Sequence, residues 1–330
     1  MGPVDVHHIT PDGVVDVTVD DIPALLSSGE GLVWVDVPAW DDEAAAALTA
    51  AFDLHPLAVH DFEVRNRLPK VHSYPDALLL VLHAPERGRG GHVHHVELDR
   101  VIGPGYLLTV HGPVNPAVAP EVALRDTREV LGRVRSGRLR PTTAFDISHA
   151  IVSTLTRRME AFVEDLTAEV WELERRVTAD SYDNPEKFLD EMFRTRHGLL
   201  AVRTIAAQTA EIYRRLTGIS RAVPDGSRHL VADLVDQFER IAGLAGEERD
   251  YLQGVIEFYR ARTETKMTIA AERLAVIAVV TLPITALASV LGMNLIVNDH
   301  TTGVPLAVAL AVMLAMSGGL LWWAKRQGWW

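Results

Sequence analysis

The sequence has no cysteine among its 330 residues. Disulfide bonds, thiolate metal ligands and cysteine nucleophiles are therefore excluded. Basic residues are also in short supply, because 32 lysines and arginines stand against 44 aspartates and glutamates, a formal net charge of −12. Nucleic-acid binding needs a positive surface to replace the counterions of the phosphates, so this charge argues against a nucleic-acid partner. It is compatible with a protein that handles cations.

Charge is almost missing from the C-terminal region. Asp299 is the only formally charged residue between Leu274 and Ala324. Residues 274–293 and 304–323 each form an uncharged stretch of about 20 residues, enough at ~1.5 Å per residue to cross the hydrocarbon core of a bilayer. We predict that both are transmembrane helices. Residues 1–15 lack the pattern of a signal peptide, so we expect the C-terminal segments to direct insertion.

The residues that flank the two apolar stretches predict their orientation. Lysines and arginines precede the first stretch and follow the second, whereas the loop between them has none. Under the positive-inside rule both termini are cytoplasmic and the loop is outside, and tryptophans mark the inner interface. The basic residues are Arg260, Arg262, Lys266, Arg273, Lys325 and Arg326, and the tryptophans are Trp322, Trp323, Trp329 and Trp330.

The rest of the chain changes character near residue 140. Before it, apolar runs bounded by glycine or proline predict strands over 13–20, 31–40, 74–85, 92–103 and 105–112, with an alanine-rich helix over 41–52. After it, apolar residues at three- and four-residue spacing predict two long helices, the second closed by Gly218, followed by a helix from Ser227 with no proline until Pro283. The prediction is an α+β membrane protein. Its parts are a cytoplasmic α/β/α domain with a helical hairpin (1–226), a stalk helix (227–273) and a transmembrane domain (274–330), the last made of a first span (274–293), an outer loop (294–303), a second span (304–323) and a tail (324–330).

Two spans in one protomer cannot enclose an aqueous path. The chain is therefore either anchored by them or assembled into an oligomer whose first spans line a channel. One face of the first span carries small or hydroxyl-bearing side chains, and a seam for helix packing would show the same pattern, so both interpretations stay open. Pro283 frees a backbone carbonyl that a hydroxyl or a water molecule can satisfy. The residues of this face are Thr268, Ala271, Ala275, Ala278, Leu282, Thr285, Ser289 and Gly292.

No carboxylate lies within either apolar stretch. A divalent cation that crosses here would keep much of its hydration shell, and Mg²⁺ dehydrates reluctantly. Oxygen atoms of Gly292, Met293 and Asn294 at the outer end could hold such a shell. An isolated Gly-Met-Asn tripeptide is more simply explained as a helix C-terminus.

The Gly-Met-Asn tripeptide is not isolated in this sequence, however. Pro-Ile-Thr at 283–285, Gly-Met-Asn at 292–294, a short loop, a second span and a basic tail with tryptophan together resemble the CorA family of divalent-cation channels. Residues 54–82 and 33–38 resemble the N-terminal domain of the same family. The resemblance implies a funnel-shaped homopentamer in the cell membrane, with a pore lined by the first span and an outer filter of Gly292, Met293 and Asn294.

By position, the resemblance assigns Thr268, Leu274, Leu282 and Thr285 to the pore face, with Leu274 near the hydrophobic constriction of the family. Several residues depart from the family pattern. An aromatic residue commonly precedes Gly-Met-Asn, whereas this chain has Leu291, and the lower pore has Thr268 and Ala271 where the family commonly has Asn and Met. The outer loop offers only Asp299 and His300 in place of the usual Met-Pro-Glu-Leu. These departures leave the choice of ion open.

Histidines are concentrated in one segment, which contains His92, His94 and His95. On a strand, the first two would lie on one face and His95 on the other. Exposed histidines at a strand edge are one interpretation. The other is a regulatory metal site between subunits, which the resemblance places at Asp233 and Asp236 of the stalk, with His94 and His92 opposite. Imidazole would favour Zn²⁺ or Co²⁺ over Mg²⁺ there.

Three functions follow from these features. The first is a channel that moves Mg²⁺, with Co²⁺ or Ni²⁺, and that is closed by metal bound between cytoplasmic domains. The second is a zinc transporter of the related ZntB type. The third is a membrane-anchored metal sensor that does not conduct. No nucleophile–base pair or phosphate-cradling motif is present in the sequence, so we do not expect an enzyme.

Overall fold

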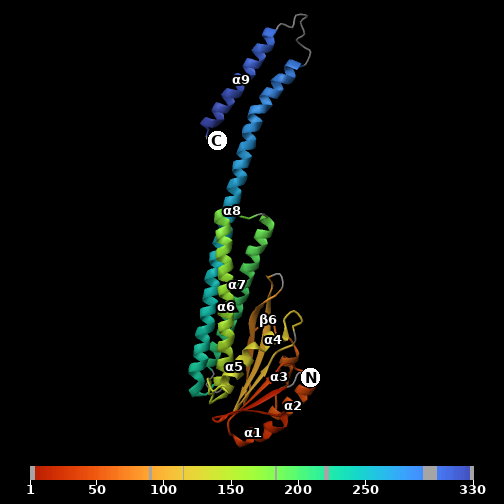
Figure 1. Ribbon diagram of the computed structural model, residues 1–330, viewed down its shortest axis with the longest axis vertical. Coiled ribbons are helices and arrows are strands. Elements are labelled where there is room, and N and C mark those ends of the chain that lie inside the picture. The colour runs from red at the N-terminus through yellow and green to blue at the C-terminus, as the bar shows by residue number, and fades with distance from the viewer. Residues whose placement is uncertain are drawn as a thin grey trace. The chain divides into compact units, whose positions relative to one another are not determined.

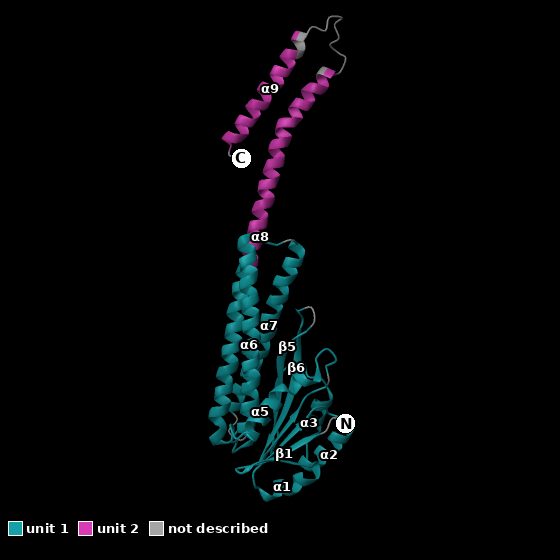
Figure 2. Ribbon diagram, in the orientation of Figure 1, with its two compact units in different colours: residues 1–255 teal, residues 256–330 magenta. Residues whose placement is uncertain are grey.

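The computed structural model describes residues 4–88, 91–113, 115–182, 184–218, 223–292 and 303–327. The chain divides into two compact units, Met1–Val255 and Ile256–Trp330 (Figure 2). The boundaries predicted at residues 226 and 273 separate parts of the chain by function. The two units are defined by packing contacts, so they do not test those boundaries, which stay predictions.

Unit 1 is built on a seven-stranded sheet in the order β2-β1-β3-β7-β6-β5-β4 (Figure 1). β3 and β7 run parallel, and every other neighbouring pair is antiparallel. The strands are β1 (Asp5–Thr10), β2 (Gly13–Val17), β3 (Leu32–Val37), β4 (Lys70–Ser73), β5 (Leu78–Arg87), β6 (Val93–Gly103) and β7 (Tyr106–Val110).

Helices cover both faces of this sheet. Because successive strand residues point to opposite faces, Trp34 of β3 joins the core beneath the long helices, and Val35 joins the core beneath the short ones. The predicted α/β/α arrangement is confirmed. The helices are α1 (Ile22–Ser28), α2 (Asp42–Phe52), α3 (Pro56–Glu63), α4 (Pro120–Ala123), α5 (Arg125–Arg135), α6 (Ala144–Ala179), α7 (Pro185–Gly218), α8 (Arg228–Gly292) and α9 (Gly303–Arg326), with 3₁₀ turns at Val19–Asp21 and Asp225–Ser227.

The long helices agree with the periodicity of the sequence. α6 begins with a capping box, in which Thr143 accepts from the backbone of Asp146 while the Asp146 carboxylate accepts from the backbone of Thr143. α7 ends at Gly218 as predicted. α8 begins at Arg228 rather than Ser227, because the chain first makes a 3₁₀ turn. It continues past Gly246, which packs closely on α7: a Cβ there would lie 3.2 Å from Arg203 Nε.

The short elements are less visible in the sequence. Periodicity does not predict β1, β4, α1, α3 or α5, since each has too few turns or pairs to show a pattern. The strand expected over residues 13–20 ends at Val17, because the Asp21 carboxylate accepts from Thr18 N at 2.9 Å and starts a helical turn. β6 begins at Val93, so His92 lies just outside the strand where it was expected.

A buried arginine joins the sheet to the long helices. Arg100 of β6 is fully buried and donates to Ser148 Oγ of α6 at 2.6 Å and to Tyr213 Oη of α7 at 2.6 Å. The described residues hold no carboxylate paired with it. Such a charge tolerates burial only with well-placed hydrogen bonds, so Arg100 fixes the positions of both helices on the sheet.

Asp99, which precedes Arg100, carries a buried carboxyl group on the opposite face of the sheet. Asp99 is fully buried, and neither of its oxygens finds a hydrogen-bond donor among the described residues. Burial raises the pKa of Asp99 well above its ordinary value, and the carboxylates of Glu97 and Asp61 raise it further, while Lys70 opposes them. The folded chain therefore holds a proton at Asp99 to a higher pH than the unfolded chain does.

We predict that Asp99→Asn raises the melting temperature of the protein by roughly 2–6 °C at pH 8. A folded-state pKa above the unfolded value gives stability that is present at low pH and lost as pH rises through the folded pKa, and the amide removes this loss. Below about pH 4 the wild type and variant should melt together, because the carboxyl is protonated in both states. Circular dichroism melts across this pH range measure the difference.

The exposed Asp76 provides the control. Asp76→Asn removes the same charge without removing a buried carboxyl, so its melting temperature should follow the wild type at every pH. Equal behaviour of the two variants would contradict the assignment of a buried, protonated Asp99.

Candidate functional site

From Leu274 onward α8 is uncharged, as is most of α9, and both helices lack a covering. No residue in the most apolar window of α8 is buried, and Leu274 and Leu282 are each 67% exposed. α9 is almost as open. The core helix of a soluble protein would be covered by neighbouring elements, so these two helices need lipid or further helices around them.

Partial burial follows one stripe on each helix of unit 2. On α8 the stripe includes Val276, Val280 and Ile284, and on α9 it includes Met313 and Leu320. These positions recur at intervals of three and four residues, which is the pattern of two helices that pack on each other. The predicted pore face of α8 lies on the other side of the helix.

The residues of that predicted face are nearly all exposed. Ala278 is half-buried, and its side chain is so small that its own helix covers much of it. The exposed ones are Thr268, Ala271, Leu274, Leu282, Thr285 and Ser289. The structure therefore leaves this face open, with its small side chains and hydroxyls turned away from the stripe that is covered.

The threonine hydroxyls of α8 are held by the helix itself. Thr268 Oγ1 donates to Glu264 O at 3.0 Å, and Thr285 Oγ1 donates to Thr281 O at 2.8 Å. With its hydrogen used in this way, each hydroxyl oxygen presents lone pairs outward. Such oxygens can accept hydrogen bonds from the water shell of a cation.

Pro283 lies inside α8 and removes one backbone donor. The carbonyl that loses its partner belongs to Val279, four residues earlier. The nearest hydroxyls do not replace the lost bond, because Thr281 Oγ1 donates to Ile277 O and Thr285 Oγ1 to Thr281 O. That a hydroxyl or a water molecule satisfies the freed carbonyl stays a prediction.

Gly292 ends α8, and a Cβ at this position would meet no other atom. Met293 and Asn294 lie outside the described residues, as do Asp299 and His300 of the outer loop. The filter and the loop therefore stay predictions from the sequence.

Asp233 of α8 lies beside α6 rather than alone on the stalk. Its Oδ2 contacts His149 Nε2 at 2.7 Å and accepts from Gln237 Nε2 at 2.6 Å. The hydrogen bond from His149 lowers the pKa of Asp233, and the bond from Gln237 lowers it further against a small effect of burial. The Asp233 carboxylate is thus ionised near neutral pH, and 52% of the side chain is exposed. It is available to a cation that approaches from outside the subunit.

The other predicted regulatory residues are scattered. Asp236 is exposed on α8, and His92 precedes β6. His94 of β6 lies opposite Glu86 of β5 in the strand register. The His94 ring lies against Gly88, where a Cβ would come within 2.1 Å of Nε2. Within the described part of the chain, no three histidine, aspartate or glutamate side chains converge as a metal site. A site made by one subunit alone is therefore not formed by these residues.

A histidine outside the predicted sites lies deeper in the sheet. His83 of β5 is buried opposite Glu97 of β6, and its Nε2 contacts Asn66 O at 2.9 Å. Burial lowers the pKa of His83 to about 4, so its ring stays neutral. The alternating polar residues His83, Glu97 and Asp99 inside apolar strands are the sequence signal that could have revealed this buried polar layer.

A second buried histidine forms an ion pair. His111 Nε2 contacts Asp36 Oδ1 at 2.8 Å at the ends of the parallel strands β7 and β3. Thr127 Oγ1 donates to Asp36 Oδ2 at 2.9 Å. Burial opposes ionisation of Asp36, but His111 and the hydroxyls lower its pKa overall. Because the Thr127 hydroxyl donates its hydrogen to the Asp36 carboxylate, the His111 imidazole does not activate that hydroxyl. The cluster therefore has a structural role in the core.

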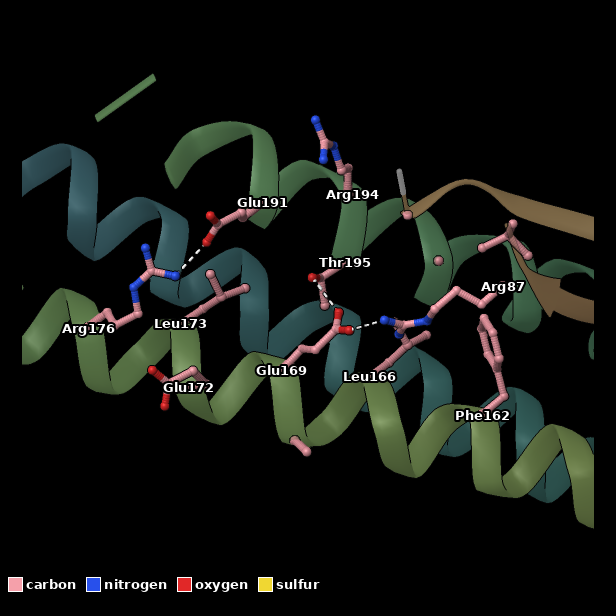
Figure 3. Close-up of a pocket in the computed structure, with 14 residues that line it drawn as sticks. Arg87, Phe162, Leu166, Glu169, Glu172, Leu173, Arg176, Glu191, Arg194 and Thr195 are labelled. Carbon is pink, nitrogen blue, oxygen red and sulfur yellow. Dashed lines mark hydrogen bonds and ion pairs between the residues drawn. The ribbon is translucent and has the colours of Figure 1, made fainter. Parts of the chain in front are cut away.

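A groove of about 440 Å³ lies between α6, α7 and the β5–β6 hairpin (Figure 3). Its floor is apolar, with Leu166 and Leu173 among its side chains. Above them the Arg87 guanidinium pairs with Glu169, which also accepts from Thr195 Oγ1 at 2.9 Å. Arg176 similarly pairs with Glu191 across the groove. The facing charges are matched, so this groove fastens the hairpin to the helices.

Two solved structures share this fold over their full length. The CorA magnesium transporter from Methanocaldococcus jannaschii has a TM-score of 0.80 and 15% identity, with 100% of both chains covered. The full-length CmaX protein has a TM-score of 0.76 and 19% identity, covering 99% of this chain and 98% of that one. At such identities the likeness establishes the fold, which is that of a membrane protein with an N-terminal α/β domain, a long helix and two C-terminal apolar helices.

The sequence comparisons establish the family. The profile of the CorA-like Mg²⁺ transporter protein family matches residues 29–326. The "Putative metal ion transporter YfjQ" of Bacillus subtilis (strain 168) is 25% identical over 303 residues, covering 90% of this chain and 89% of that protein. The chain therefore belongs to the CorA-like Mg²⁺ transporter protein family, and it is a metal ion transporter of the membrane.

We predict that single cysteines on the open face of α8 react with a water-soluble thiol reagent. The natural absence of cysteine means that each variant carries one thiol. In lipid vesicles, Ser289→Cys and Thr285→Cys should be labelled much faster than Leu287→Cys, because we expect the first two to line a water-filled path and Leu287 lies on the covered stripe. Mass spectrometry of the intact protein measures the labelled fraction. Equal rates at all three positions would contradict a water-filled path along this face.

Proposed function

We propose that the protein is a divalent metal cation channel of CorA type in the cell membrane. It moves Mg²⁺, and with it Co²⁺ or Ni²⁺, through a pore lined by α8, with both termini in the cytoplasm. The observation that carries the proposal is the open face of α8 from Thr268 to Ser289, which is small, bears hydroxyls and lies opposite the stripe that packs.

A pore of this kind needs several copies of the chain. One α8 and one α9 cannot surround water, and the exposed Leu274 and Leu282 require apolar neighbours in the membrane. A homopentamer, as the family resemblance implies, would place five α8 faces around one axis and five α9 helices outside them. Leu274 would then form the narrowest apolar ring.

The chemistry of the pore face favours a hydrated ion. Between Leu274 and Gly292 the face offers hydroxyl oxygens and no carboxylate. An ion with tightly held water can pass by exchanging hydrogen bonds between its shell and those oxygens, which suits Mg²⁺. Gly292, Met293 and Asn294 would form the filter at the outer mouth.

Metal on the cytoplasmic side would control opening. The exposed carboxylates of Asp233 and Asp236 are one half of the proposed site, and His94 and His92 of a neighbouring copy are the other. Metal bound there neutralises charge between subunits and holds them together. Because α8 runs unbroken from Arg228 to Gly292, release of the metal would be transmitted directly to the pore.

One prediction from this proposal concerns conduction. Purified protein in liposomes should take up Mg²⁺, and Asn294→Ala should abolish that uptake because the amide is part of the filter. Asn298→Ala removes a second asparagine of the same loop and should retain uptake. A fluorescent Mg²⁺ indicator inside the vesicles measures the flux. Uptake that survives in Asn294→Ala would contradict the proposed filter.

The same vesicles separate the alternative functions. Zn²⁺ uptake with little Mg²⁺ uptake would place the protein with zinc transporters of ZntB type, which the histidines near β6 favour. Intact oligomers that pass neither ion would leave the non-conducting sensor. Mg²⁺ uptake above Zn²⁺ uptake supports the channel as proposed.

The second prediction concerns gating. Asp233→Ala should raise the Mg²⁺ concentration that inhibits flux from the cytoplasmic side by about fivefold or more, because a ligand of the closing metal is lost. His149→Gln is the matched control, since it breaks the same ion pair but keeps the carboxylate. Flux against internal Mg²⁺ measures both. If the two variants respond alike, the ion pair and not metal binding sets the inhibition.

A further inference from the structure

One stretch of this acidic chain is strongly basic, and the transport function does not use it. Residues 125–140 contain six arginines and two acidic residues. The structure places them on α5 and on the loop that leads into α6 (Figure 1). An arginine cluster in a protein of net charge −12 indicates a local role that solubility does not explain.

Part of this stretch forms the wall of a pocket of about 470 Å³. Arg133 comes from the last turn of α5, Arg140 from the loop, and Arg157 from α6, so three guanidinium groups from separate elements line one cavity. His149 and Ser153 of α6 lie between them. The volume falls within the usual range for small-molecule sites and exceeds what a single small ion needs.

Two of these arginines have no ionic partner. Arg157 pairs with Glu129 at 2.9 Å, but no carboxylate in the described part of the chain lies within ion-pair distance of Arg133 or Arg140. Asp146 is the one carboxylate in the lining, and its Oδ2 already accepts from Thr142 N, Thr142 Oγ1 and Thr143 N at 2.8–2.9 Å. Three arginines in the lining therefore stand against one carboxylate, that of Asp146, while Arg157 is paired with Glu129 from outside the lining, so the lining carries a net positive charge.

The other lining side chains suit an organic anion. Leu139, Ala150 and Leu230 add apolar side chains to the lining. Arginine binds phosphate through paired N–H donors, and two free guanidinium groups can engage two phosphate groups or two edges of one. In the groove of Figure 3, by contrast, Arg87 and Arg176 each pair with a carboxylate of the lining.

We propose that this pocket binds a phosphorylated small molecule, with its phosphates on Arg133 and Arg140 and its apolar part against Leu139 and Leu230. The chemical class is a compound with two or more phosphate groups, such as a nucleoside triphosphate. The site lies wholly within unit 1, and its existence does not depend on the conduction mechanism.

The test is isothermal titration calorimetry on the full-length protein in detergent, with a chelator present so that Mg²⁺ does not complex the probe. Inorganic tripolyphosphate and ATP are the probes. We expect saturable binding of at least one of them at physiological salt. Arg133→Ala/Arg140→Ala should weaken it by roughly tenfold or more, because two charge-assisted hydrogen-bond donors are lost.

The control is Arg125→Ala/Arg128→Ala, which removes the same charge from exposed positions of the same helix outside the pocket. It should bind as the wild type does. Equal weakening in both double variants would show that the probes respond to net charge alone, and this would overturn the proposal. Absence of binding by the wild type would overturn it as well.

The two probes also separate the sources of the phosphate. Tighter binding of ATP than of tripolyphosphate supports a nucleotide whose base contacts the apolar side. Equal binding of the two supports a site that reads phosphate groups alone. None of the four substituted arginines is buried, and none has an ionic partner among the residues that the structure describes. The variants should therefore fold, and matching circular dichroism melts would verify this.

Discussion

A helix that is apolar on all sides must be surrounded by apolar material, and the organisation of this protein follows from that constraint. α8 and α9 cover only one stripe of each other, which leaves most of their apolar surface without a partner. Lipid can cover the outer side of such a pair. For the face with Thr285 and Ser289 we propose a different covering, which is copies of the same chain around a shared path.

The sheet of unit 1 has a different task, which is to hold long helices in defined positions. Apolar residues supply most of the burial, but they are not specific about angle or register. The specific contacts are polar: Arg100 reaches Ser148 and Tyr213 from the sheet, and Asp36 gathers His111 and Thr127. Each of these groups would be costly to leave unpaired in the core, so each fixes one arrangement. The proposed gating would gain from such stiffness, because a displacement of this domain would then be passed on to α8.

Local sequence predicts the elements whose pattern is long or strongly apolar. α6 and α7 repeat their apolar residues over many turns, and the strands around Trp34 and Leu80 are buried on both faces, so their signals are clear. β1, α1 and α3 are short, and their conformations depend on neighbours distant in the sequence. Asp233 illustrates the same limit at the site, because its alignment in the family predicts a metal ligand, whereas its contact with His149 depends on how α6 packs against α8.

The sequence by itself determined that the chain has two membrane spans, an α/β domain before them, and the Gly-Met-Asn signature at positions 292–294. Those features depend on composition and order, which need no folding to be read. Only the tertiary structure decided which face of α8 is covered, that Asp99 and Arg100 are buried without ionic partners, and that Arg133, Arg140 and Arg157 surround one pocket. Such facts depend on residues far apart in the chain coming together, and that proximity is created by packing rather than by local pattern.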